Sequence, residues 1–261
     1  MQKEDIKFKS STLFEGMTSI RAVISGIDCG ISDRKIEKII FDKSNLKKIS
    51  KEIGYFKAVS SKYGFVIEQA TKEFLNKICV GNAHGGIVAY TNERTIPRLS
   101  AEFIRGQNFF TLIQGVEDPY NFGYSLRSLY AMGCDGIILP ERNWMSAAGV
   151  VARSSAGASE RMRLFTAEPE EAIDIFKLEG YSVVCADERT ENTLGNCSIK
   201  CPLLLIVGGE RRGISRTVLD KADLLVKINY AREFRASLSA ASAATMLAYE
   251  ILRQNPNIVK N

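Results

Sequence analysis

The sequence FFTLIQGVEDPYNFGYSLRSLYAMG (109–133) predicts an α/β fold, because an apolar run is followed by an Asp-Pro turn and then by a helical pattern. The run FFTLIQGV has the length and composition of a buried strand. Pro119 disfavours helical geometry at the residue before it, so Asp118 ends the extended segment. We predict that a helix follows and that Asn121 caps it. A strand, a turn and a helix in this order form the repeating unit of a parallel α/β sheet.

The same alternation continues to the C-terminus. We expect strands at DGIILP, YSVVCAD, PLLLIVGG and LLVKI, and helices at SAAGVVARSSAGA, PEEAIDIFKLEG, SRTVLDKA and SAASAATMLAYEILR. Strands that alternate with helices favour a parallel sheet with helices on both faces.

The first hundred residues predict a smaller α/β unit. Its expected strands are KIEKIIFD, FKAVSS and GGIVAY, and its expected helices are SIRAVISGI (ending at Gly26), SNLKKISKEIG (capped by Ser44 or Asn45 and ending at Gly54) and ATKEFLNKIC. The polar stretch TNERTIPRLSAEF contains Pro97 and is the predicted linker. We therefore expect one domain over 1–100 and a second over 106–261.

Composition is that of an ordinary globular protein. The chain has 261 residues, of which 45% are hydrophobic and 25% charged. No apolar run reaches the roughly 18 residues of a membrane-spanning helix. The N-terminal MQKEDIKFKS lacks the apolar core of a secretory signal. None of the six cysteines forms a CxxC pair, so we expect reduced thiols in a cytoplasmic protein rather than disulfides or a zinc site.

Charge is distributed unevenly along the chain. Residues 1–105 hold 18 Lys and Arg against 12 Asp and Glu, whereas the remainder has a net charge of −1. A basic half is consistent with a polyanionic partner. It is equally consistent with a lysine-rich surface that is simply solvated, and charge alone does not decide between them.

Several common sites are absent from the sequence. No GxGxxG follows the first strand of either half, so the sequence lacks the glycine motif of a Rossmann dinucleotide-binding site. Gly208 and Gly213 have the spacing of a phosphate-binding loop, but Ile214 stands where that loop needs lysine. His84 is the only histidine, so Ser-His-Asp or Cys-His catalysis lacks a nearby base and histidine metal clusters are excluded.

Two further segments carry candidate ligand-binding residues. In IVGGERRGIS, Gly208 and Gly209 end an apolar strand and allow a sharp turn and close backbone approach, and Glu210 follows. This position is the carboxyl end of a strand, where open α/β sheets bind ligands. In INYAREFRASLSAASAATMLAYE, Ile228 ends a strand and the pair Ser237-Leu238 opens a small-residue run into the last helix.

In this order, DPYNFGYSLR, IVGGERRGIS and the segment from Ile228 to Glu250 resemble the three motifs of the SpoU (TrmH-type) branch of the SPOUT RNA methyltransferases. The resemblance implies a parallel sheet with a C-terminal trefoil knot and S-adenosylmethionine as the cofactor. It also implies methyl transfer to a ribose 2′-hydroxyl of structured RNA by a homodimer whose site lies near the interface, with no metal and no membrane.

The resemblance assigns roles to matching residues. The catalytic positions are Asn121, Arg127, Glu210, Ser237 and Ser239, and the cofactor-binding positions are Gly208, Gly209, Ile228, Ser237 and Leu238. Ser239 departs from the pattern, which has asparagine there. Because guanidinium seldom deprotonates, we expect Arg127 to hold the RNA phosphate and stabilise the developing alkoxide. The proton acceptor is left open among Glu210, Ser237 and water.

The N-terminal unit carries a second resemblance. GNAHGGIVAY is similar to the His-Gln-Gly-Val-Val-Ala stretch of the small ribosomal-protein-like RNA-binding domain that precedes many SpoU catalytic domains, with Gly85 in place of glutamine. This implies a domain that docks RNA, ribosomal RNA more than transfer RNA. His84 is either a hydrogen-bonded turn residue or an RNA contact. The alternatives are a tRNA ribose methyltransferase, a base-modifying SPOUT enzyme and a catalytically silent SPOUT-fold RNA-binding protein.

Overall fold

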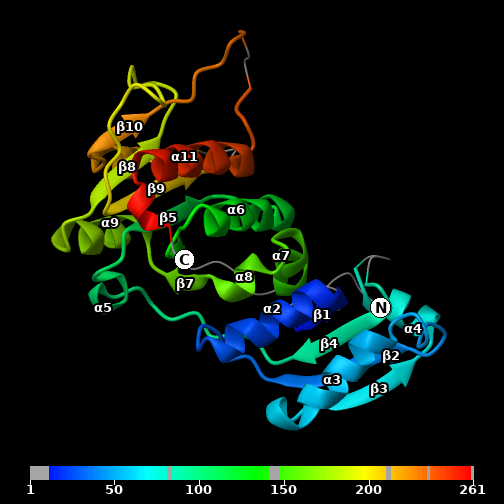
Figure 1. Cartoon of the computed structure of the whole chain (residues 1–261). Helices are drawn as coiled ribbons and strands as arrows, with labels where there is room; N and C mark the ends of the chain where they lie inside the picture. The colour runs from blue at the N-terminus through cyan, green and yellow to red at the C-terminus, as the bar shows by residue number, and fades with distance from the viewer. Residues whose placement is uncertain (1–11, 81–83, 141–146, 210–212, 234–235, 260–261) are drawn as a thin grey trace. The chain divides into compact units, whose positions relative to one another are not determined.

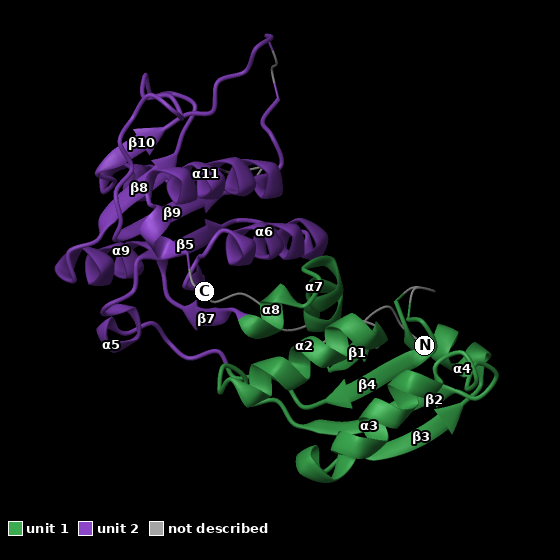
Figure 2. Ribbon diagram, in the orientation of Figure 1, with its two compact units in different colours: residues 1–95, 143–161 green, residues 96–142, 162–261 purple. Residues whose placement is uncertain are grey.

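The computed structural model describes residues 12–80, 84–140, 147–209, 213–233 and 236–259, and the chain separates into two compact units (Figures 1 and 2). The first unit comprises residues 1–95 and 143–161, and the second comprises 96–142 and 162–261. Within the described ranges, no helix combines the length and the apolar character needed to cross a membrane.

The second unit is built on a six-stranded sheet with the order β10-β8-β9-β5-β6-β7. Every neighbouring pair is parallel, which confirms the predicted parallel sheet. The strands are β5 (Phe109–Gln114), β6 (Gly136–Leu139), β7 (Arg163–Thr166), β8 (Ser182–Ala186), β9 (Leu203–Gly208) and β10 (Leu224–Val226). The predicted trefoil knot stays a prediction.

Helices cover both faces of this sheet, as predicted. On one face α6 (Pro119–Ala131) and α11 (Ala240–Gln254) lie side by side, and the Thr245 hydroxyl donates to Ser128 Oγ at 2.6 Å (Figure 1). The other face packs against α9 (Pro169–Leu178) and α10 (Arg216–Asp220). The remaining helical segments are α5 (Ala101–Ile104) and the short 3-10 turn η2 (Pro256–Ile258).

The start of α6 differs from the predicted cap. Asp118, not Asn121, caps the helix, because its carboxylate accepts from the backbone N–H of Tyr120 and of Asn121. Pro119 occupies the first helical position, where a missing N–H costs nothing. Asn121 is therefore inside the first turn, and Arg127 lies in the second half of the 13-residue helix.

The first unit contains a four-stranded mixed sheet with the order β1-β4-β2-β3, in which only β2 and β3 are parallel. Its strands are β1 (Leu13–Glu15), β2 (Ile36–Asp42), β3 (Val66–Ala70) and β4 (Ile87–Thr91). Its helices are α2 (Gly16–Asp28), α3 (Ser50–Tyr63), α4 (Lys72–Ile78), α7 (Ala148–Ser154) and α8 (Ala158–Arg161). The small α/β unit is present, with two strands (β1 and β3) that the pattern did not predict.

One helix was placed wrongly from the sequence. Of the predicted helix over 44–54, only residues 50–54 are helical, and they belong to α3 together with the whole of the predicted strand FKAVSS. The reason is an apolar spacing of three that continues past the glycine: Ile53, Phe56 and Val59 all pack on the core of this unit. Glycine at position 54 only weakens a helix that tertiary packing holds.

Residues 143–161 belong with the N-terminal sequence, although a single boundary near residue 100 was expected. Arg153 Nη1 lies 2.8 Å from Glu15 Oε2, and Arg94 donates to the Ser159 carbonyl at 2.9 Å. Gly157 sits against Ala22 so closely that an added Cβ would overlap the Ala22 methyl group. The compact units therefore differ from the expected ranges 1–100 and 106–261, whose separate roles stay predictions.

Candidate functional site

The parallel sheet of the second unit brings several strand ends to one edge. Gln114 pairs with Gly208, and Ala186 pairs with Val226, so four carboxyl ends lie next to one another. A cavity of about 740 Å³ opens there. Its walls are the segments that follow β8, β9 and β10, together with the start of α11.

Two glycines form the turn at the end of β9. An added Cβ on Gly208 would stand 2.5 Å from the carbonyl carbon of Gly213, and one on Gly209 would overlap the carbonyl oxygen of Gly115. The Gly209 N–H donates to the Gln114 carbonyl at 2.7 Å. The glycines are thus required by contact of the chain with its own backbone, and that contact shapes the cavity wall.

The segment after β10 supplies the opposite wall. Ile228 and Leu238 are half-buried and line the cavity, and Ser237 lines it from an exposed position. The Leu238 N–H donates to the hydroxyl oxygen of Tyr230 at 3.2 Å, which draws the two ends of this segment together. Apolar surface and backbone amides therefore meet in one wall.

Ser239 has a structural task at the start of α11. Its Oγ accepts from the Ser242 N–H at 3.2 Å and lies 3.0 Å from Ser242 Oγ. A hydroxyl in this position satisfies one of the free amides of the first helical turn. Serine at 239 therefore positions the helix that borders the cavity.

The segment after β8 was not among the predicted site residues. Asp187, Glu188 and Arg189 line the cavity, and Arg189 Nη2 lies 2.6 Å from Asp187 Oδ2. The hydrogen bond from Arg189 lowers the pKa of Asp187. The strand YSVVCAD ends at Asp187, so the rule that ligands bind at the carboxyl ends of parallel strands could have found these residues.

The predicted residues separate into four groups. The cavity brings together all five predicted cofactor residues, Gly208, Gly209, Ile228, Ser237 and Leu238. Asn121 and Arg127 lie on α6 and are not among the described residues that line it. Ser239 caps α11, and Glu210 lies outside the described residues.

Arg127 belongs instead to an exposed face of α6 that also carries Tyr120 and Tyr124. These residues follow the i, i+4, i+7 spacing of one helical face. The neighbouring α11 exposes Met246 and Tyr249. Both packed helices therefore expose large apolar side chains, which is a feature of interaction surfaces.

The described residues contain neither a disulfide nor a cluster of metal-binding side chains. The described residues contain no group of three or more His, Cys, Asp or Glu side chains placed to hold a metal ion. All six cysteines are free. The described residues that line the cavity are small, apolar, polar and charged.

These features define an α/β protein with a cavity at the carboxyl edge of a parallel sheet. The sequence profile of the SpoU rRNA methylase family matches residues 108–249. The chain is also 30% identical over 232 residues to YacO of Bacillus subtilis, a protein named for the TrmH family of tRNA/rRNA methyltransferases, and the match covers 86% of this chain and 91% of that one. The chain belongs to the SpoU rRNA methylase family.

Solved structures agree with the fold. An RNA 2′-O ribose methyltransferase superposes with a TM-score of 0.77 at 22% identity, covering 94% of this chain and 88% of the other. The SpoU methyltransferase AviRb of Streptomyces viridochromogenes, in complex with the cofactor AdoMet, gives a TM-score of 0.76 at 22% identity, covering 98% and 99%. At these identities the likeness establishes the fold.

Proposed function

We propose that this protein transfers the methyl group of S-adenosylmethionine to a ribose 2′-hydroxyl of structured RNA, ribosomal RNA in the first place. The single observation that carries the proposal is the cavity at the sheet edge, which unites the glycine turn after β9 with the loop after β10. Three segments of the second unit, which follow β8, β9 and β10, contribute to it. Family membership supplies the reaction class.

The cavity fits the cofactor in size and chemistry. A volume of about 740 Å³ is within the ordinary range for small-molecule sites. Ile228 and Leu238 offer apolar surface for the adenine ring, and the segment from Asp187 to Arg189 offers polar partners for the ribose and the amino acid group. The cofactor supplies an electrophilic methyl group on a sulfonium, so the protein must position the hydroxyl and control charge.

Arg127 is the proposed charge-controlling residue. The planar guanidinium group can hold a phosphate next to the reacting ribose and stabilise negative charge that develops on the 2′-oxygen. Glu210, Ser237 and a water molecule remain the candidate proton acceptors.

We propose a homodimer, because Arg127 is exposed and is not among the described residues that line the cavity of its own chain. Its exposed face on α6 carries Tyr120 and Tyr124, and α11 adds Met246 and Tyr249. A second copy that covers this face would bury the aromatic side chains. The partner's Arg127 would then approach the cavity of the first copy, which would complete the site.

We assign RNA docking to the first unit and place the activity in the cytoplasm. The N-terminal part of the chain is basic, with net charge +6 over residues 1–105. Positive charge of this kind favours the phosphate backbone of RNA. Six free thiols are consistent with a reducing compartment.

The test is methyl transfer from labelled S-adenosylmethionine to total RNA, followed by nucleoside mass spectrometry. The expected product is a 2′-O-methylated nucleoside from ribosomal RNA. Label on a base would assign base modification, and label confined to transfer RNA would reassign the substrate. Calorimetry with the cofactor separates a silent RNA-binding protein, which has no need to bind it, from an enzyme that lacks its RNA.

A further inference from the structure

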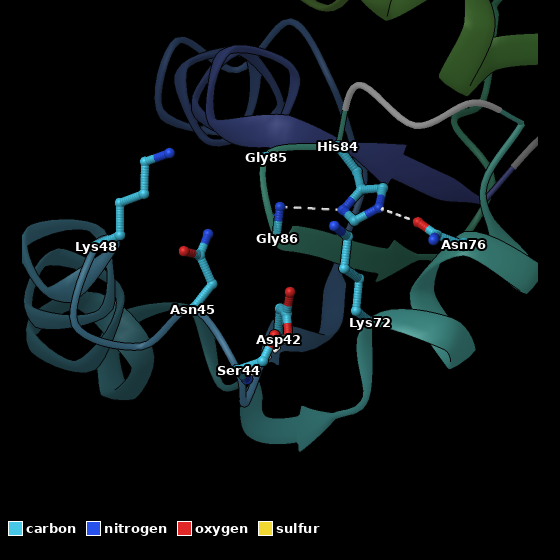
Figure 3. A pocket seen from close by; sticks show the side chains of 9 residues that line it. All are labelled: Asp42, Ser44, Asn45, Lys48, Lys72, Asn76, His84, Gly85 and Gly86. Atoms are coloured by element: carbon cyan, nitrogen blue, oxygen red, sulfur yellow. Dashed lines mark hydrogen bonds between the residues drawn. The ribbon is translucent and has the colours of Figure 1, made fainter.

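The first unit contains a polar cavity that the proposed methyl transfer does not use. Its volume is about 410 Å³, and residues from the end of β2, the following turn, α4 and the loop before β4 surround it (Figure 3). The base of the cavity is formed by Asp42, His84 and Gly86, which are buried. The rim carries Lys48 and Lys72, which are exposed.

Asp42 is a buried carboxylate with free acceptor capacity. Only 3% of the residue is exposed, yet its side chain lines the cavity. Oδ1 accepts from the Ser44 N–H at 2.9 Å and from the Ser44 hydroxyl at 2.6 Å. Oδ2 has no hydrogen-bond partner among the described residues. This oxygen is not among the enclosed unpartnered atoms, so it is open to the cavity and can accept a hydrogen bond from water or from a ligand.

Asp42 is ionised at neutral pH. Burial by itself would raise its pKa, but the hydrogen bonds from Ser44 and the positive charge of Lys72 outweigh burial, and the pKa is lowered. The group is therefore an acceptor only. Whatever occupies the cavity must present N–H or O–H groups to it.

Hydrogen bonds of His84 hold the loop before β4 in place beside the cavity. The Gly86 N–H donates to His84 Nδ1 at 3.0 Å, so Nε2 carries the proton and donates to Asn76 Oδ1 at 2.9 Å. His84 is therefore hydrogen-bonded within the turn, and its role as an RNA contact stays a prediction. An added Cβ on Gly86 would stand 3.2 Å from both Asp42 Cβ and Asn45 Nδ2, so glycine keeps this wall clear.

The charges around the cavity exclude a simple phosphate site. Lys48 and Lys72 lie on opposite sides, with Asn45 and Asp42 between them (Figure 3). Neither lysine has an ion pair with a described residue. A carboxylate between the lysines would repel a bare phosphate. The arrangement fits a ligand that presents hydrogen-bond donors to Asp42 and negative charge to the two lysines.

We propose that this cavity binds one unpaired guanosine of the RNA. Guanine presents two adjacent donors, N1–H and N2–H₂, on its Watson–Crick edge, and both can converge on Asp42 Oδ2. The Asn45 amide can donate to O6, and the lysines can contact the flanking phosphates. Adenine, cytosine and uracil lack the paired donors. Single-stranded bases read by their edges are the usual mode of sequence-specific RNA recognition.

This inference rests on RNA as the substrate and adds the nucleotide that the first unit selects. The full chain is titrated with the pentaribonucleotides UUGUU, UUIUU, UUAUU and UUUUU (I is inosine), and with free GMP. We expect UUGUU to bind at least tenfold more tightly than the adenine and uracil versions. Inosine, which lacks the 2-amino group, should lose about tenfold because one hydrogen bond to a charged acceptor is missing.

The variant Asp42→Asn makes the assignment sharper, because asparagine keeps an acceptor for Ser44 but turns a donor toward the base. It should lose the preference for guanine and gain affinity for UUXUU, where X is xanthosine with a carbonyl in place of the 2-amino group. The control is Glu37→Gln on the same strand, an exposed residue whose change removes the same charge. It should leave the guanine preference intact.

Three outcomes would overturn the inference. These are equal affinities for the four pentanucleotides, an Asp42→Asn variant that still prefers guanine, and free GMP that binds more tightly than UUGUU. Methyl transfer to total RNA is measured on the same preparation. Transfer without guanine preference would reject only this inference, whereas absence of transfer and of cofactor binding would reject the proposed function.

Discussion

Arg34 and Glu160, 126 positions apart in the chain, form an ion pair that is almost fully buried. Arg34 Nε lies 2.9 Å from Glu160 Oε2, and the two side chains are 1% and 4% exposed. Arg34 Nη1 also donates to the Asn92 carbonyl at 2.8 Å. The pair attaches α8 to the sheet-bearing part of the first unit, which explains why residues 143–161 belong to that unit.

Replacing Glu160 by Gln should destabilise the first unit strongly. The change keeps the shape of the side chain but leaves the Arg34 guanidinium buried without a counter-ion. Breaking one partner of a buried pair costs about 3–5 kcal/mol. Urea unfolding followed by circular dichroism would measure the loss.

The control is Glu68→Gln, which removes an exposed ion pair with Lys38. The side chain of Lys38 is 37% exposed and that of Glu68 is 46% exposed. An exposed pair contributes about 0–1 kcal/mol, so this variant should unfold near the wild-type midpoint. Equal losses in the two variants would show that burial of the Arg34–Glu160 pair has no energetic consequence.

The second unit was more predictable from sequence than the first, for a physical reason. Strands such as LLLIVGG are buried on both faces and read as continuous apolar runs between turn residues. In the first unit, FKAVSS is short and apolar enough for a strand, but packing of Phe56 and Val59 makes it part of α3. The assignment of residues 143–161 depends on contacts over more than a hundred positions, which local patterns do not contain.

The sequence also predicts some features of the site better than others. Gly208 and Gly209 could be predicted because a glycine turn at the carboxyl end of a parallel strand marks a binding edge. Whether the Arg127 side chain reaches the cavity depends on how α6 packs. The helical pattern predicts only the face of α6 on which Arg127 lies. The cap at Asp118 was also missed, because Asn121 is an equally good capping residue and the choice depends on where the turn ends.

Gly209→Ala should damage the cofactor cavity. The added methyl group would overlap the Gly115 carbonyl oxygen, so the turn after β9 has to move away from β5. We expect at least a tenfold loss of affinity for S-adenosylmethionine, together with a stability loss of about 1–3 kcal/mol typical of overpacking. Isothermal calorimetry and urea unfolding would measure the two effects.

The matched change is Gly54→Ala, which adds the same methyl group where no atom lies within 4 Å. Because Gly54 lies inside α3, alanine should stabilise the helix by about 0.5–1 kcal/mol. Cofactor affinity should not change. A Gly209→Ala variant that binds the cofactor as well as Gly54→Ala does would contradict the close approach at the sheet edge.

Two substitutions of Ser239 distinguish its role as a helix cap from a role in catalysis. Ser239→Ala removes the acceptor for the Ser242 N–H and should cost about 1 kcal/mol of stability. Ser239→Asn keeps a good cap and restores the residue of the family pattern, so stability and methyl transfer should be at least those of the wild type. If Asn transfers methyl groups and Ser does not, the serine has silenced the natural chain.

The thiols should react in an order set by burial. Desolvation raises the pKa of Cys134 to about 12 and that of Cys185 to about 12, so at pH 8 neither forms appreciable thiolate in the folded chain. Cys29 is exposed and should react first with a chromogenic disulfide. Cys29→Ser should remove the fast phase, and unfolding in urea should release all the thiols. Fast native labelling of Cys134 would contradict the packed sheet.

Arg127→Lys tests whether this arginine acts in turnover or only in binding. Lysine keeps the positive charge, so the dissociation constant for RNA and that for the cofactor should change little. An ammonium is a point charge without the planar pair of donors that a guanidinium offers to a phosphate and a developing alkoxide. Loss of one such donor typically lowers kcat by about 10²–10³-fold. Single-turnover methyl transfer at saturating RNA would measure it. The control is Arg105→Lys, an exposed arginine that pairs with Glu179, and this variant should retain full turnover. Wild-type turnover in Arg127→Lys would remove this residue from the chemistry, whereas loss of RNA affinity with unchanged kcat would make it a docking residue.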